Sequence, residues 1–527
     1  MTTTEQLQRA VHANREAFNT VNVHFQRVER DRTEARLRLA EVQAEVAQLD
    51  REHGRFGALK NQLLKELVLS RAFYQRHIMA RFPEELLRDI FIHCSNDASR
   101  DWYDDTKWTS NYTTPIQVIT KWIIMPYRLA TVCQKWRTVA LETGCLWAYV
   151  ATDTRPGEND DEVMQSQLLR AATSFLRTKS APLHVHLPWQ WVKLHDYRTS
   201  RSVNLAHKLL TDIQRSAYRL DRVSLGIVPQ FTDTMYSIFK APTPTLTFLF
   251  MEESWVSEQD PEESIFTAGL PYAPNLRSME LYGSGRLETA LQCESLNSMR
   301  SLRLWAADTS SVECYVPRCS SLRHLTLSVN EGEHYGGLRL DLQHLQVLSL
   351  TGSMFFASEA DPEPRIVAPG LESLILDELD VTPGHRRLLQ SLNPSQLTLR
   401  YMGLEWILNL SCLKNVRRLV FGGQRTQGDA APVIEDAIFE LLCDTSPPIW
   451  PKLEEIVIEG GGEQTEIEPE DAPELLRLAA MRGPRRLSGR GADNEVTVAT
   501  LVKIELNHDP PAYLQSEIER LLTPIAS

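Results

Sequence analysis

The first 78 residues carry apolar side chains at alternating steps of three and four positions. This spacing aligns them along one side of a helix, and two apolar residues per heptad are typical of a coiled coil. The stretch has no proline and only two glycines, Gly54 and Gly57, which favours one long helix. The apolar positions are Leu7, Val11, Phe18, Val21, Phe25, Val28, Ala35, Leu39, Val42, Val46, Leu49, Phe56, Leu63 and Leu67, interrupted by the polar Asn14, Arg32 and His53.

So narrow an apolar seam needs a partner helix, because it is too narrow for burial in a globular core. Two partners satisfy the pattern. One is a second copy of the chain, which gives self-association through a coiled coil. The other is the rest of the same chain, onto which the helix would fold back.

Residues 80 to 150 predict two or three short helices with a polar interruption at 95 to 115. Apolar residues at 86, 87, 90 and 91 follow Pro83, the pattern of an amphipathic helix that begins at a proline. A second unit starts at Pro126, and Leu146-Trp147 closes the segment. The segment holds more apolar and aromatic side chains than its size can bury alone, which indicates a docking surface.

This segment resembles an F-box, which reads roughly Leu-Pro-x-Glu-Ile/Leu-x-x-x-Ile-Phe, a spacer, Leu-x-x-Val-Cys-x-x-Trp-Arg-x-x-Ala and Leu-Trp. The sequence departs from that pattern by Phe82 in place of leucine and by a longer spacer. The alternative is a generic helical connector. The matching residues are Pro83, Glu85, Leu86, Ile90, Phe91, Leu129, Val132, Cys133, Trp136, Arg137, Ala140, Leu146 and Trp147.

The resemblance implies that the segment binds the Skp-type adaptor of a cullin-RING ubiquitin ligase. The adaptor contacts that it implies are Phe82, Pro83, Leu86, Ile90, Leu129, Val132 and Trp136.

From residue 220 onward, apolar residues recur at the first, fourth and sixth places of a repeated unit. Four successive units start at Leu276, Met299, Leu322 and Leu345, each 23 residues after the last. This period resembles leucine-rich repeats, which implies a stacked, irregular α/β solenoid lined by a parallel sheet. The asparagine that usually turns the chain after the strand is mostly missing. An ordinary β-rich domain is the alternative.

The flanks of the repeats predict further elements. Before them we expect helices at 163–176 and around 205–213, with a strand at 183–187 between them. Within and after them we expect a helix at 434–442, a strand around 496–504 and a closing helix at 513–522. The predicted domains are a coiled-coil helix (1–78), an F-box with an insertion (80–150), a linker with a first repeat-like unit (151–215) and the solenoid with its cap (216–527), an α+β multidomain protein.

The strand positions between the repeat anchors should face outward and form a concave binding surface. Aromatic and arginine side chains dominate interface energies, so Tyr282, Arg303 and Trp305 are the predicted centre of a target-binding site, with His324 and Arg400 further along. Trp305 can equally serve to cover the neighbouring strand.

Composition limits the partners. The chain has 56 Lys and Arg against 69 Asp and Glu, a net charge of -13, which disfavours nucleic acid. Its eight cysteines are scattered, and no signal peptide or membrane-spanning run is evident, so a cytoplasmic or nuclear protein without membrane contact is expected. We find no phosphate loop, metal-ligand spacing or nucleophile motif, and therefore expect no catalytic residue, metal or cofactor.

Two charge runs remain, an acidic one at 454–474 and an arginine cluster that includes Arg482 and Arg485. We expect a solvated loop with internal ion pairs, and the alternative is a strip that recognises a partner. Ser488 follows two arginines in the pattern of a basophilic kinase site.

The order of the two resemblances, F-box and then leucine-rich repeats, is that of many substrate receptors of ubiquitin ligases, and the whole chain is similar to the large F-box families of mushroom-forming (basidiomycete) fungi. The expected function is therefore to hold the adaptor, and through it a cullin, at one end and an unknown protein target at the other. A non-catalytic scaffold is the alternative, and an enzyme built on the solenoid is a weaker one.

Overall fold

The structure, a computed structural model, describes residues 3–101, 116–152, 161–189, 201–228, 231–253, 270, 272–282, 296–305, 312, 315–328, 339–352, 365–377, 388–400, 404–422, 436–444, 449–459, 472–484, 499–506 and 512–523. The chain divides into two compact units, Met1–Pro83 and Glu84–Ser527. Of the predicted segments, 151–215, 216–527 and most of 80–150 therefore belong to one compact unit.

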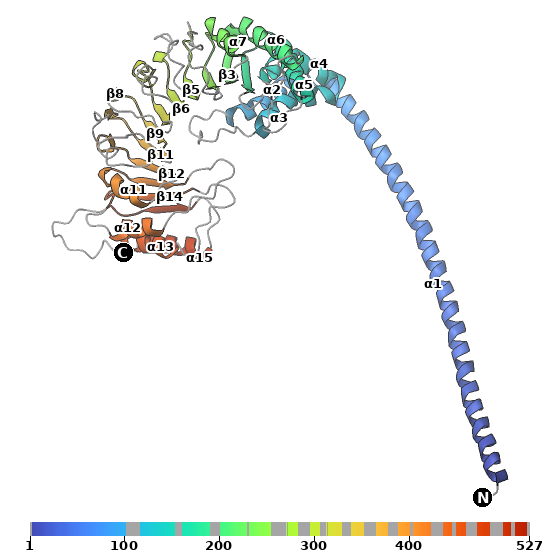
Figure 1. Cartoon of the computed structure of the whole chain (residues 1–527). Coiled ribbons are helices and arrows are strands. Elements are labelled where there is room, and N and C mark those ends of the chain that lie inside the picture. The colour runs from blue at the N-terminus through green and yellow to red at the C-terminus, as the bar shows by residue number, and fades with distance from the viewer. Residues whose placement is uncertain are drawn as a thin grey trace. The chain divides into compact units, whose positions relative to one another are not determined.

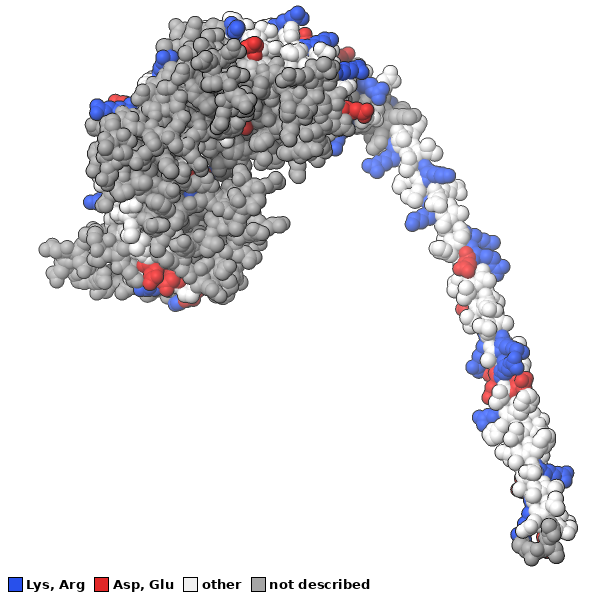
Figure 2. All heavy atoms as spheres, in the orientation of Figure 1, with Lys and Arg blue, Asp and Glu red and all other residues white. Residues whose placement is uncertain are grey.

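The first unit consists of a single helix, α1 (Thr3–Arg81). It continues through Gly54 and Gly57 and ends just before Phe82 and Pro83, slightly beyond the predicted boundary at 78. The predicted long N-terminal helix is thereby confirmed. Figure 2 shows charged side chains at intervals along α1, with uncharged surface between them.

The second unit begins with a helical module. Its elements are α2 (Glu84–Asp101), α3 (Ile116–Val132), α4 (Gln134–Glu142) and the 3-10 turn η1 (Gly144–Trp147).

Two sequence-based expectations for this module were wrong. The polar stretch predicted at 95–115 is helical up to Asp101, because residues 95–101 contain no glycine or proline that would stop α2. Residues 102–115 lie outside the described residues. Pro126 does not begin a helix but lies inside α3, where it is buried, as Ile123 is. The apolar run before Pro126 thus carries the helix across the proline despite the backbone hydrogen bond that proline cannot make.

Thirteen parallel strands form one sheet, and they follow one another in chain order (Figure 1). The expected mixed helix and strand class is therefore confirmed. The strands are β1 (Tyr149–Ala151), β2 (Leu183–Pro188), β3 (Leu220–Ile227), β4 (Phe248–Glu253), β5 (Ser278–Tyr282), β6 (Ser301–Trp305), β7 (His324–Ser328), β9 (Val347–Thr351), β11 (Ser373–Asp377), β12 (Gln396–Arg400), β13 (Arg418–Phe421), β14 (Glu455–Ile458) and β15 (Lys503–Leu506). A separate parallel pair is formed by β8 (Arg339–Asp341) and β10 (Arg365–Val367).

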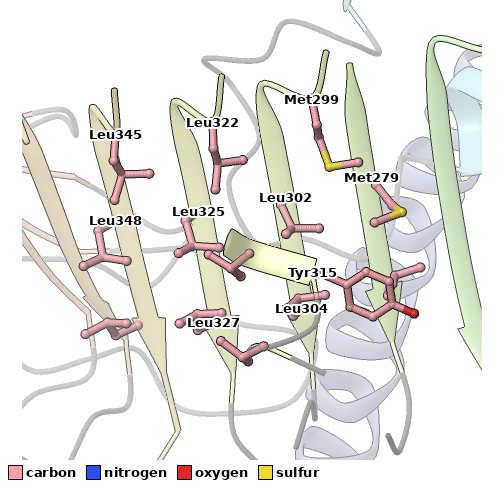
Figure 3. Packing of buried hydrophobic residues seen from close by; sticks show 14 of the residues in the cluster. Met279, Met299, Leu302, Leu304, Tyr315, Leu322, Leu325, Leu327, Leu345 and Leu348 are labelled. Atoms are coloured by element: carbon pink, nitrogen blue, oxygen red, sulfur yellow. The ribbon is translucent and has the colours of Figure 1, made fainter. Parts of the chain in front are cut away.

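The repeated apolar triplet explains both the strands and their register. Leu302 on β6 lies opposite Leu325 on β7, which in turn lies opposite Leu348 on β9. All three are buried, and Figure 3 shows them on one side of neighbouring strands. The first member of most triplets closes a short turn, as when the amide of Leu322 donates to the carbonyl of Cys319 at 3.1 Å. One continuous hydrophobic core therefore extends from Val150 to Ile518.

Helices and turns occupy the connections between strands. The helices predicted before the repeats, within 421–453 and at the C-terminus are present as α5, α6, α12 and α15. The strand predicted around 496–504 is shorter and begins later, as β15. Val496 and Val498 lie outside the described residues. The elements are α5 (Asp161–Arg177), α6 (Arg201–Arg215), η4 (Ala217–Arg219), α7 (Thr232–Ser237), η6 (Ile238–Lys240), η7 (Val316–Arg318), α11 (Leu404–Asn409), η8 (Leu410–Cys412), α12 (Asp436–Asp444), α13 (Ala472–Arg482) and α15 (Ala512–Leu522).

Arg482 corrects the expectation of a solvated arginine cluster. It ends α13, is buried, and donates through Nη2 to the carbonyls of Leu442 at 3.0 Å and Ile449 at 2.9 Å and through Nη1 to that of Trp450 at 3.3 Å. Burial lowers the pKa of the guanidinium, against which the nearby Cys443 acts. This arginine thus joins three segments near the end of the sheet. Arg485 and Ser488 lie outside the described residues.

Candidate functional site

The helical module has an aromatic interior. The rings of Phe91 and Trp136 meet edge to face at 4.9 Å between centroids, and Leu87 is buried one turn before Phe91 on α2. Trp147 is also buried, and its Nε1–H donates to the carbonyl of Ala140 at 2.7 Å. These contacts hold α2, α4 and η1 together through one face of α2.

The neighbouring face of α2, about 100° around the helix from Leu87 and Phe91, presents aliphatic side chains at the surface. Leu86 is 50% exposed and Ile90 is 45% exposed, each one residue before a buried partner in the chain. Val132, at the end of α3, is exposed as well. Leu86, Ile90 and Val132 are therefore the predicted adaptor contacts that lie at the surface of the second unit.

The other predicted adaptor contacts are placed differently. Leu129 is buried within the second unit, and Trp136 is half-buried against Phe91, so both support the module's interior. Phe82 and Pro83 belong to the first unit, where Pro83 is exposed and Phe82 is half-buried.

The module is joined to the sheet without a linker. Residue 147 ends η1 and residue 149 begins β1, the first strand, which pairs with β2. The guanidinium of Arg177, from α5, lies 4.3 Å from the centroid of the Trp147 ring, and the ring of Tyr127 meets the same tryptophan at 5.0 Å. The Nζ of Lys179 donates to the carbonyl of Glu142 at 3.2 Å.

A glycine is needed at position 144 because η1 passes close to the backbone of Thr178, just after α5. A Cβ atom at this position would lie 2.5 Å from the carbonyl oxygen of Thr178, which is backbone and cannot move aside easily. We expect Gly144→Ala to destabilise the second unit by about 1–3 kcal/mol, measured as the free energy of unfolding in urea. Gly57→Ala is the control, because a Cβ at Gly57 has nothing within 4 Å. Equal stability of the two variants would contradict the close packing.

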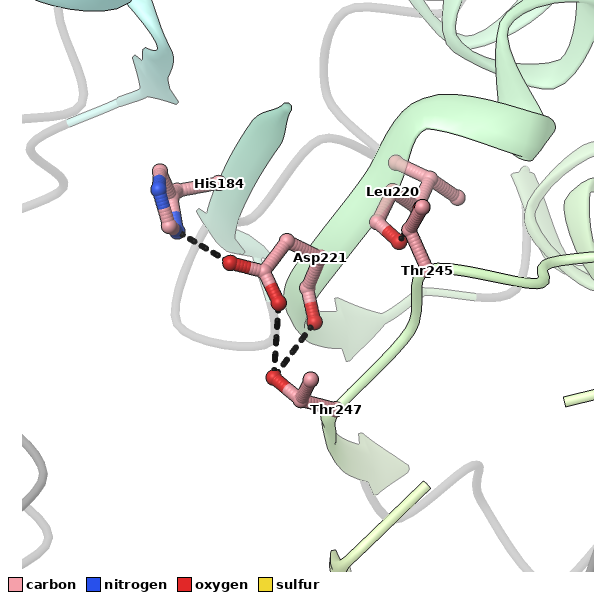
Figure 4. Close-up of polar contacts among 5 residues, drawn as sticks. All are labelled: His184, Leu220, Asp221, Thr245 and Thr247. Atoms are coloured by element: carbon pink, nitrogen blue, oxygen red, sulfur yellow. Dashed lines mark hydrogen bonds and ion pairs between the residues drawn. The ribbon is translucent and has the colours of Figure 1, made fainter. Parts of the chain in front are cut away.

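A cluster of polar side chains lies near the start of the sheet, and no motif in the sequence predicts it. The Nδ1 of His184 lies 3.9 Å from Oδ2 of Asp221, and the hydroxyl of Thr247 donates to Oδ1 of Asp221 at 2.7 Å (Figure 4). The ring of Tyr149 stacks on His184 at 4.7 Å. Burial lowers the pKa of His184 to about 4, with Asp221 opposing the shift and Arg222 adding to it. At neutral pH the imidazole of His184 is therefore uncharged, and its role is to pack against Tyr149 and Asp221.

The predicted target-binding residues divide into a group and two outliers. Glu252, Tyr282 and Trp305 occupy matched places on β4, β5 and β6, and one row away Glu280 is matched with Arg303. Tyr282 and Trp305 lie side by side, with ring centroids 6.3 Å apart. The strand alternation therefore brings Tyr282, Arg303 and Trp305 together.

His324 and Arg400 lie elsewhere on the sheet. His324 is matched with Ser301 and Val347, in a different row from Trp305. Arg400 is on β12, four strands from β6 and thus about 19 Å along the sheet. It is buried, and its Nη1 lies 3.7 Å from Oδ2 of Asp377, so its charge is already balanced within the chain.

Glu280 belongs to the same group, and its burial is the feature that the sequence did not predict. It is only 4% exposed, and its Oε1 accepts a hydrogen bond from Nε1 of Trp305 at 3.2 Å. Among the described residues, its Oε2 has no hydrogen-bond partner. Burial raises the pKa of this carboxyl, while Arg303 and the Trp305 bond act in the opposite direction. Trp305, itself 8% exposed, thus covers β5 as well as lining the surface.

No protein-family profile matches this sequence, and no curated protein is significantly similar to it. Within the described ranges, no group of histidine, cysteine and acidic side chains could hold a metal ion. Among the helices of those ranges, none is both long and apolar enough to cross a membrane.

Proposed function

We propose that this protein is the substrate-recognition subunit of a cullin-RING ubiquitin ligase. In this proposal the helical module is an F-box that binds a Skp-type adaptor, and the sheet is the inner face of a leucine-rich-repeat solenoid that binds a target protein. The chain then acts by holding a target close to the ubiquitin-loaded enzyme, without a catalytic side chain of its own.

The observation that carries the proposal is the division of α2 into two apolar faces. Leu87 and Phe91 hold the helix in the module, while Leu86 and Ile90 remain exposed to solvent. Exposed aliphatic side chains on a helix that already has a buried face are typical of a surface that a partner covers. These are two of the positions that the F-box resemblance assigns to the adaptor.

The sheet supports the second half of the proposal. Its strands are parallel and in chain order, and their anchors form matched rows of buried leucines, as stacked repeats require. The positions between the anchors carry Tyr282, Arg303 and Trp305. Aromatic and arginine side chains are enriched in the energetic centres of protein interfaces.

Glu280 indicates what kind of group such a target would bring. Its carboxyl group lies buried beneath the ring of Trp305, to which it is hydrogen-bonded. Glu252, also buried, lies beside Tyr282 on the neighbouring strand. A lysine or arginine side chain of the target, stacked on the rings of Tyr282 and Trp305, would gain from the rings and from the negative charge near them.

Affinity capture of a recombinant Skp-type adaptor by the full chain tests the proposal. We expect the double variant Leu86→Asp with Ile90→Asp to capture the adaptor at least about tenfold less well, because two charges would enter an apolar contact. Both side chains are exposed, so the fold should persist, which thermal unfolding checks. Trp136 is less suitable because it packs against Phe91.

The matched control is Leu169→Asp with Leu176→Asp on α5, where both leucines are also exposed. This control should capture the adaptor as well as the unaltered chain does. Failure of the unaltered chain to capture an adaptor, or equal capture by both double variants, would contradict the proposal and favour a scaffold without ligase binding.

A further inference from the structure

The apolar seam of α1 is exposed over its whole length. We define it as the apolar positions at steps of three and four from Leu7 to Leu67. These side chains, apart from the smaller Ala35, are between 51% exposed at Val46 and 69% exposed at Phe18. Water contact along so long an apolar line is unfavourable, and its width of two residues per heptad suits one neighbouring helix.

The length of the seam selects the neighbour. From Leu7 to Leu67 it extends for about 90 Å at 1.5 Å per residue. Among the described residues, the next longest helix is α2, with 18 residues. No single described helix of the second unit could therefore cover the seam, whereas a second copy of α1 matches it from end to end.

The residues that flank the seam select the orientation. In each heptad, the first seam residue is the one that is followed three places later by the second, as Arg32 is followed by Ala35. In a parallel, in-register pair, the residue just before a first seam residue faces, in the other copy, the residue five places further along the chain. This rule pairs Asp31 with Arg36, Glu66 with Arg71, and Leu59 with Leu64. Each pair is complementary in charge or in apolarity, and Glu45 with Asp50 is the one like-charged combination along the described helix.

Three of the four charged residues in these flanking pairs form no ion pair within the described part of α1. The ion pairs within the described part of α1 involve His12 with Glu16, Arg32 with Glu29 and Arg38 with Glu34. Asp31, Arg36 and Arg71 form none there. They are thus available to a second copy.

An antiparallel pair fits less well. When two antiparallel helices are centred between residues 40 and 41, the charged flanking residues that face each other across the seam are Asp31 with Glu52, Glu29 with Asp50 and Arg38 with Glu45. Two of these three combinations are like-charged. Like charges in these flanking positions oppose association. The parallel arrangement also places the polar seam residue Arg32 beside Asp31 of the second copy, and His53 beside Glu52 of the second copy.

We propose that two copies of the chain associate through α1 as a parallel, in-register coiled coil. The proposal goes beyond ligase binding and does not depend on it. The protein would then present two helical modules and two sheets in one assembly.

The mass in solution of the full chain, measured by light scattering after gel filtration, tests the association. We expect twice the mass of one chain, and the mass of one chain for the double variant Val28→Asp with Leu39→Asp. Leu37→Asp is the matched control for the second change. Leu37 is 64% exposed and Leu39 58% exposed, but Leu37 lies off the seam.

A monomeric unaltered chain would overturn the proposal. So would a dimer that the double variant leaves intact, because α1 would then not hold the copies together. Helix content measured by circular dichroism checks that the variants retain α1.

A cysteine placed in the seam tests the orientation. In the parallel pair, Val28→Cys brings the two thiols face to face, where a disulfide can form. In the antiparallel pair the same thiols lie roughly 37 Å apart at 1.5 Å per residue. Thr33→Cys, on the outer side of α1, is the control for cross-linking through the native cysteines, such as the exposed Cys94. A dimer in which Val28→Cys cross-links no better than Thr33→Cys would overturn the parallel arrangement.

Discussion

Arg482→Met is expected to lower the free energy of unfolding by about 3–5 kcal/mol, because the carbonyl groups of Leu442, Ile449 and Trp450 would each lose a hydrogen bond from the buried guanidinium. Methionine keeps most of the volume and removes the five N–H groups. Trp450, one of the acceptors, has a φ of 48°, in the left-handed region that a non-glycine residue adopts only when its surroundings hold it there. Loss of the arginine should therefore also loosen this turn.

The control for this change lies on the same helix. Arg477 is exposed and pairs with Glu474 at 3.2 Å, an interaction across one helical turn at the surface. Arg477→Met should change stability by no more than about 0.5 kcal/mol. Unfolding in urea and hydrogen exchange of β14, β15 and α13 are the measurements. Equal effects of the two substitutions would show that the buried guanidinium is dispensable.

Acidification is expected to destabilise the second unit between about pH 6.5 and pH 4. Burial lowers the pKa of both His184 and His186 from 6.5 to about 4. In that window the unfolded chain binds protons that the folded chain does not, so stability falls as the pH falls. Relative to neutral pH, each histidine lowers the free energy of unfolding by about 2 kcal/mol at pH 5 and by about 3 kcal/mol at pH 4.

Urea unfolding at about pH 7.5 and about pH 5 measures this loss. The double variant His184→Asn with His186→Asn should flatten the difference, although it also removes the contact of His186 Nδ1 with the Ser224 hydroxyl at 2.9 Å. His344→Asn is the control because His344 is exposed. Glu280 acts in the opposite sense, since its raised pKa favours the folded state at low pH. A pH dependence unchanged in the double variant would contradict the role given to the two histidines.

The sequence predicted the sheet because each anchor leucine is buried for a local reason. The spacing of Leu322, Leu325 and Leu327 alone places the second and third on one face of a strand, and the same triplet 23 residues later supplies the neighbouring strand. The long helix was predictable for a similar reason, since its heptads and the absence of proline act within a few turns.

The remaining features depend on residues that are distant in the chain. Arg482 can be buried because the carbonyl groups of Leu442, Ile449 and Trp450 accept its hydrogen bonds. No local sequence pattern predicts this arrangement. Alternation groups Trp305 with Tyr282 on neighbouring strands, but it does not predict the hydrogen bond from Trp305 to Glu280. Likewise, the amphipathic pattern after Pro83 did not distinguish Leu86 from Leu87, and it is the packing of α2 against α4 that buries Leu87.

The strand order of the sheet also bears on how the chain folds as it leaves the ribosome. Among the described strands, each strand of the large sheet pairs with its nearest sheet neighbours in the sequence, and β8 and β10 form a separate pair. Contacts of this kind have short sequence separation and need little loop closure, so they favour rapid folding. Folding of the second unit can therefore begin at β1 and β2 and add one strand at a time during synthesis, so that each new strand meets an edge already formed.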